Sequence, residues 1–151
     1  MDTLIDILHI GTAVFIVGPM AILPMTGLRA LRSGSAAQVT TLAKSTMIFS
    51  WLSLLTFVFG FGAMSLAPKQ YDLSFTTPWI LTSVILYVIA FALSAFVVVP
   101  QMNKAAEAIE AAGAGADAAG SKPAGYGAIA GTSGIVSLLL VVVVVLMIWK
   151  P

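Results

Sequence analysis

The single histidine of the chain, His9, follows an aspartate, Asp6, by three residues. On a helix this spacing places both side chains on one face, where the carboxylate can orient the imidazole ring and favour its charged form. Such an imidazole could bind a haem iron, contact a quinone or relay a proton; alternatively, it is a polar residue near the membrane surface that hydrogen-bonds a neighbouring helix. We therefore take His9 as the candidate cofactor-binding residue and Asp6 as the residue that orients it.

A haem b bound by His9 would need a second axial ligand, and the chain has no second histidine. Met20 lies about 16 Å from His9 along a continuous helix, so the two side chains cannot bind one iron. Of the methionines in the first two predicted helices, only Met64 would lie at a depth in the membrane similar to that of His9. Methionine is, however, mainly a packing residue. We expect no cofactor. The alternative is a haem b whose second ligand comes from a homodimer, a methionine or another protein.

No other group of residues matches a catalytic pattern. A Ser–His–Asp set is excluded because the acid close to His9 is its neighbour on the same helix. Cysteine is absent, and so are a glycine-rich phosphate loop, a histidine cluster and a carboxylate pair within a hydrophobic segment. The formal net charge is +1, with no long basic run, so nucleic acid is not an expected partner. The sequence thus predicts a protein that is not an enzyme, with no catalytic residues and no metal site.

The elements that would position these residues are hydrophobic helices. Hydrophobic residues make up 60 % of the chain and charged residues 9 %, and the mean hydropathy is +1.06. Because a bilayer core of roughly 30 Å requires about 20 apolar residues in a helix, four segments qualify as membrane spans. The predicted fold is an all-α, four-transmembrane-helix bundle that forms one domain over residues 1–151. Its helices are expected over about 4–31, 36–66, 78–112 and 123–149, with a flexible linker over about 113–122.

The distribution of lysine and arginine predicts the orientation of the spans. The loops after the first and third spans carry five basic residues, and the opposite side carries two: Arg29, Arg32, Lys44, Lys104 and Lys122 against Lys69 and Lys150. We therefore expect both termini on the outer, periplasmic side. The richness in alanine, glycine and valine, with few lysines, favours a bacterial source. The expected location is the bacterial cytoplasmic (inner) membrane, with lipid as a further partner.

Two helices carry small residues along one face, a pattern that allows close helix packing in membranes. The fourth helix has Gly127, Gly131 and Gly134, and the second has a stripe that includes Phe49, Ser53, Thr56, Gly60 and Ala63. Four helices cannot use both faces internally, so we expect one face to pack within the bundle and the other to receive a partner.

Gly18-Pro19 lies deep in the first span, where proline removes a backbone donor and kinks the helix. Broken helices can form ion sites in transporters, which normally have two of them together with charge inside the membrane. The sequence indicates one broken helix and no evident internal repeat. A small transporter is therefore the third functional hypothesis.

The stretch Leu8-His9-Ile10-Gly11-Thr12-Ala13-Val14-Phe15, followed by Gly18-Pro19-Met20 and the basic end Leu28 to Arg32, resembles a bacterial family of small predicted integral membrane proteins of unknown function. This resemblance implies four helices and an early histidine in the first. Other four-helix families with such a histidine, the copper-resistance membrane proteins and the haem-pathway protoporphyrinogen oxidases, use histidines for metal or haem. In size and composition the chain is also similar to small accessory subunits of the actinobacterial cytochrome bcc–aa3 supercomplex. This similarity is one of general type and involves no shared motif.

These observations lead to one preferred functional hypothesis. The chain is expected to be a non-catalytic accessory subunit of a larger membrane complex, such as a respiratory-chain cytochrome oxidase assembly, with other integral membrane subunits as partners. A haem- or quinone-binding redox protein that uses His9 is the alternative.

Overall fold

The structure of the chain is a computed structural model that describes residues 2–67, 73–113, 123 and 125–149. Its described residues form four long helices, two of them with a short π-helical segment in the middle. The first span consists of α1 (Asp2–Thr12), η1 (Ala13–Val17) and α2 (Gly18–Arg32), the second of α3 (Ala36–Leu66), the third of α4 (Pro78–Leu93), η3 (Ser94–Val98) and α5 (Val99–Ala112), and the fourth of α6 (Tyr126–Trp149). Each is long and apolar enough to cross a membrane.

This architecture confirms the predicted all-α fold with four membrane-spanning helices. The side of the membrane on which the termini lie remains a prediction. Most of the predicted linker over 113–122 lies outside the described residues; Gly113, which ends α5 with φ of 73°, is its one described position.

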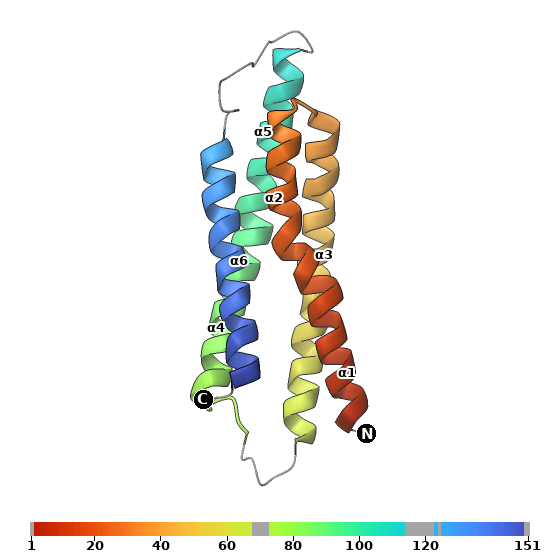
Figure 1. Cartoon of the computed structure of the whole chain (residues 1–151), viewed down its shortest axis with the longest axis vertical. Coiled ribbons are helices and arrows are strands. Elements are labelled where there is room, and N and C mark those ends of the chain that lie inside the picture. Colours follow the sequence, from red (N-terminus) through yellow and green to blue (C-terminus); the bar gives the residue numbers. More distant parts are fainter. Residues whose placement is uncertain (1, 68–72, 114–122, 124, 150–151) are drawn as a thin grey trace.

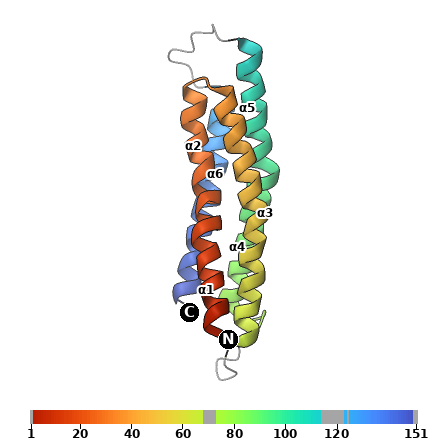
Figure 2. The ribbon, with the colours of Figure 1, turned by 90° about the vertical axis from the view of Figure 1, so that its right-hand side faces the viewer.

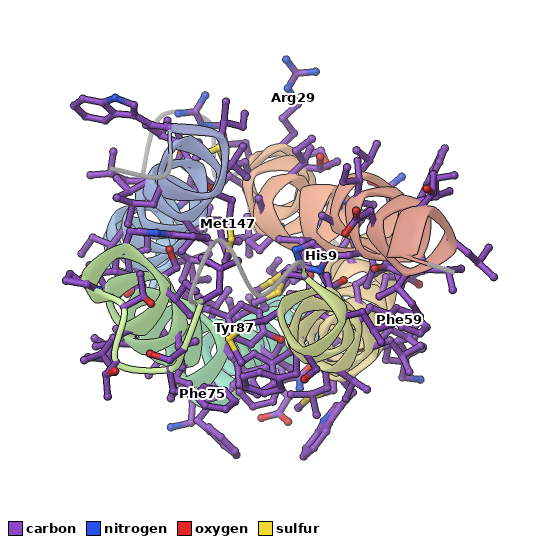
Figure 3. The ribbon with its side chains drawn as sticks, turned by 90° about the horizontal axis from the view of Figure 1, so that it is seen from below. His9, Arg29, Phe59, Phe75, Tyr87 and Met147 are labelled. Atoms are coloured by element: carbon purple, nitrogen blue, oxygen red, sulfur yellow. The ribbon has the colours of Figure 1, made fainter. Side chains whose placement is uncertain are left out.

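The spans stand side by side as a long bundle (Figures 1 and 2). Both chain termini lie at one end, which we call the terminal end, and the short α2–α3 turn lies at the other. We call that other end the basic end, because it carries the exposed residues Arg29, Arg32, Lys44 and Lys104. Seen along the bundle (Figure 3), the first span lies between the second and the fourth, and the third lies diagonally opposite the first.

The turn between α2 and α3 is short because a glycine reverses the chain. Gly34 has φ of 68°, a left-handed conformation that glycine adopts at little cost. The amide N–H groups of Gly34 and Ser35 donate to the carbonyls of Leu31 and Ala30, at 3.1 Å each. These bonds satisfy the last carbonyls of α2 and place α3 antiparallel to it.

The best-packed part of the core lies toward the basic end. Met20, Leu31, Val39, Met102 and Ile129, from all four spans, have exposed fractions of at most 1 %. Outward-facing positions are apolar instead: Phe15, Ile22 and Phe96 are each more than 60 % exposed, as expected for side chains in contact with lipid.

Candidate functional site

His9 reaches from α1 toward the second span and the bundle axis (Figure 3). Its Nδ1 lies 2.9 Å from the carbonyl oxygen of Thr56 on α3, and because a carbonyl can only accept, Nδ1 carries the proton. The ring packs on Gly60: a Cβ at that position would lie 2.9 Å from the ring's Cε1. Any larger residue at this position would require the ring to shift. Among the described residues, Nε2 has no hydrogen-bond partner.

Asp6 does not orient His9 in the structure. Its side chain is exposed, and within the described part of the chain no hydrogen bond or ion pair joins it to the ring. The orienting group is instead the Thr56 carbonyl, forty-seven residues away in the sequence. The helical spacing places Asp6 on the same side of α1 but one turn closer to the terminal end, where its side chain is exposed.

The predicted small-residue face of α3 is used inside the bundle. Ser53 is fully buried, and its hydroxyl lies 2.6 Å from the hydroxyl of Tyr87 on α4. One turn away, the hydroxyls of Ser50 and Ser94 lie 2.9 Å apart, which joins α3 to η3. Such hydroxyl pairs between helices are worth about 0.6 kcal/mol on average in membrane proteins. These serines and Tyr87 join the second and third spans.

The remaining predicted residues of this face are less uniform. Thr56 is 7 % exposed, and its hydroxyl is buried with no partner among the described residues. Gly60 contacts His9, while Ala63, nearer the end of α3, is half-buried. Sequence reasoning did not identify Ser50, Tyr87 or Ser94, because isolated hydroxyls in an apolar helix indicate a contact only when the facing helix is known.

The glycine face of α6, formed by Gly127, Gly131 and Gly134, points away from the bundle. A Cβ added at any of the three would meet no atom within 4 Å. The opposite face of α6, with Ser133 buried among its neighbours, makes the internal contacts, and Ser137 donates to the carbonyl of Ala21 at 3.0 Å. Of the two predicted packing faces, one is therefore internal and the other is open.

Two broken helices are present where the sequence indicated one. η1 and η3 are π-helical, and each is followed by one further residue and then a proline, Pro19 or Pro100. The amide of Gly18 bonds the carbonyl of Ala13, and the amide of Val99 bonds that of Ser94, both with five-residue spacing. The sequence signal that could have found the pair is the repeated motif Phe-(Ile/Val)-Val-x-Pro, at residues 15–19 and 96–100.

The hydrogen bond at Nδ1 leaves Nε2 of His9 as the ring atom that could accept a hydrogen bond or bind a metal. A backbone carbonyl that holds Nδ1–H is the usual support of a ligating histidine. A Cβ at Gly60 would lie 3.8 Å from Nε2, so α3 lies close beside the ring. No group of three or more His, Asp or Glu side chains that could hold a metal ion occurs among the described residues.

Comparison with known proteins identifies a family. The family described as "Predicted integral membrane protein (DUF2269)" matches residues 3–151, almost the whole chain. No curated protein and no solved structure matches it. The chain therefore belongs to this family of predicted integral membrane proteins, a multi-pass architecture that the four apolar helices also support.

Proposed function

We propose that this family member is a non-catalytic accessory subunit that packs against other integral membrane subunits through the glycine face of α6. The observation that carries the proposal is the open space at Gly127, Gly131 and Gly134, where no atom of the described residues lies within 4 Å of an added Cβ. The equivalent stripe of α3 is already occupied by Tyr87 and His9.

The energetics of glycine in a helix support an interface at this face. Each glycine inside a helix costs roughly 0.5–1 kcal/mol relative to alanine, so three of them cost about 1.5–3 kcal/mol. No contact among the described residues offsets that cost, because none of their helices uses the space. In a membrane, association depends on close backbone contact and van der Waals packing, which glycines at four-residue spacing provide. A partner helix seated on this face would supply the compensating contacts.

The spacing also indicates what kind of partner fits. Gly127 and Gly131 form a Gly-x-x-x-Gly pair near the basic end of α6, the pattern of helix pairs that cross at about −40°. The partner is therefore a transmembrane helix with small residues at the same depth. We propose that the complex is a respiratory-chain oxidase assembly of a bacterial inner membrane, because such complexes contain small helical subunits of similar size and composition.

Co-purification in mild detergent with matched variants tests this proposal. Gly131→Leu adds bulk to the open face at an exposed position where no described atom lies within 4 Å of an added Cβ. Ala128→Leu adds similar volume at an exposed position of the same helix beside that face. We expect partner subunits, identified by mass spectrometry, to be depleted at least about tenfold by Gly131→Leu and retained by Ala128→Leu. A wild-type protein that runs alone, at its own mass plus detergent, refutes the proposal, and so does equal recovery from both variants.

A second candidate function is a redox role for His9 with a quinone or haem b. It is favoured by the hydrogen bond of Nδ1 to the Thr56 carbonyl, which leaves Nε2 as an acceptor. The visible spectrum of the purified protein distinguishes this candidate. A Soret band lost in His9→Ala supports haem, bound quinol lost in the same variant supports quinone, and a colourless, quinone-free protein eliminates both.

A further inference from the structure

The first and third spans share a local design. Phe15 and Phe96 each begin the motif Phe-(Ile/Val)-Val-x-Pro, and both side chains are directed outward, with exposed fractions of 76 % and 64 %. In both spans the π-helical segment ends two residues before the proline. These are the two π-helical segments within the described residues, so the break recurs at one motif in each half of the chain.

Such a break weakens a helix at a defined place. Pro19 and Pro100 have no N–H, so a carbonyl in the preceding turn lacks its helical donor. The wider π turn shifts the bonding by one residue and leaves another carbonyl without a regular partner on return to α-helical spacing. A helix bends more easily where these backbone bonds are missing. By contrast, Pro24 is buried inside α2, and the turn directly before it is α-helical.

The basic and the terminal side of the two breaks differ in which helices pack against each other. Toward the basic end, α2 packs on α3 and α6, α3 packs on α5, and the side chain of Arg32 bonds the hydroxyl of Tyr126. Toward the terminal end, α1 packs on α3 and α4 packs on α6, but no extended packing joins α1 to α6 or α3 to α4 within the described residues. The two helix pairs accordingly diverge toward the chain termini (Figure 1).

Side chains of α3 join the two pairs among the described residues. Ser53 hydrogen-bonds Tyr87, whose ring stacks on Phe57 with centroids 5.4 Å apart, and Trp51 packs edge-on against Phe91 at 5.5 Å. Nearer the terminal end, the ring of Phe61 packs on Phe75, just before α4, at 4.9 Å. These contacts link α3 to α4 and to the segment before it, so they can act as a latch between the two pairs.

We propose that η1 and η3 are paired hinges on which α1 and α4 swing, so that the terminal half of the bundle opens and closes while the basic half stays packed. The motion carries α1 and α4 relative to α3 and α6, which have no such break, and releases the contact between Ser53 and Tyr87. A bend of about 20° moves a residue about 20 Å from its hinge by about 7 Å. Tyr87 lies seven residues, about 10 Å, from η3, so the same bend moves it by about 4 Å, which is enough to break its hydrogen bond to Ser53.

Distance measurements between spin labels in lipid nanodiscs test the hinges, and the absence of native cysteine makes labelling at introduced cysteines specific. A terminal pair at Ile7 and Leu81 reports on α1 and α4, both at exposed positions. A basic pair at the exposed positions Met25 and Asn103 reports on α2 and α5. We expect two populations of the terminal distance, separated by at least about 5 Å, and a single narrow distance for the basic pair.

Three variants connect the motion to the hinges and the latch. The double variant Pro19→Ala/Pro100→Ala, or either single variant if the double fails to fold, should collapse the terminal distances to one population. Pro24→Ala is the matched control and should leave both populations unchanged. Tyr87→Phe removes the latch hydroxyl and should raise the ratio of open to closed protein about threefold. A single narrow terminal distance in the wild type overturns the proposal, as does a double population that neither hinge proline nor Tyr87 affects.

Discussion

The substitution Gly27→Ala gives the sharpest test of how tightly the basic half is packed. A Cβ at Gly27 would lie 2.5 Å from the terminal methyl of Met102, whereas carbon atoms in contact are normally about 3.5–4.0 Å apart. The methyl ends a flexible side chain and can rotate away, but Met102 has an exposed fraction of 0 %, so its neighbours must adjust as well. Overpacking of this kind costs about 1–3 kcal/mol, and the better helix propensity of alanine offsets about 1 kcal/mol of it. The expected net loss in the free energy of unfolding is about 0–2 kcal/mol.

Gly131→Ala is the matched control, because nothing lies within 4 Å of its added Cβ. The propensity gain is common to both variants, so the difference between them isolates the clash, about 1–3 kcal/mol. Reversible unfolding by a denaturing detergent, followed by circular dichroism, measures both. In a Met102→Ala background the difference should vanish. If Gly27→Ala stabilises the protein as much as Gly131→Ala does, the close packing of Gly27 on Met102 is refuted.

Three further predictions concern the polar side chains of the bundle. His9→Ala should lower the free energy of unfolding by about 1–2 kcal/mol, because the hydrogen bond to Thr56 and the ring packing are lost. Asp6→Asn should leave the free energy of unfolding unchanged in the same assay. Equal losses in the two variants would indicate that Asp6 orients the ring after all. Thr56→Val should be neutral or stabilising, because it removes a buried hydroxyl without a partner, and a clear loss would reveal an unseen partner of that hydroxyl. In a double-mutant cycle, Ser53→Ala and Tyr87→Phe should couple by about 0.5–1.5 kcal/mol; additive effects would contradict the bond between them.

The membrane-spanning fold was predictable because it depends on local composition. A continuous helix is the one way to satisfy backbone groups within a short apolar segment in lipid, so runs such as Val141 to Val145 indicate a span without reference to any other residue. The start of α4 at Pro78 also depends on local sequence alone, because the missing N–H of proline is harmless at the first position of a helix.

The candidate site was less predictable because its partners are distant in the sequence. Asp6 lies on the same helix face as His9 by spacing alone, yet the ring bonds Thr56, and that pairing requires the relative position of α1 and α3. Gly60 was recognisable as a small residue, but its role in admitting the ring follows only from the contact. The hydroxyl pairs of α3 with Tyr87 and Ser94 likewise depend on how two helices are rotated against each other.

Sequence alone determined that this chain is a four-helix membrane protein with one early histidine and two small-residue faces, because hydropathy and helical spacing are properties of single segments. The tertiary structure determines which of those faces packs inside the bundle and which stays open. It buries Ser53 and Thr56 and leaves Gly127, Gly131 and Gly134 open. It also revealed the second broken helix, at Pro100. The physical reason is that the rotation of each helix about its axis is set by the packing of all four, and lipid, being as apolar as the side chains, selects no face by itself.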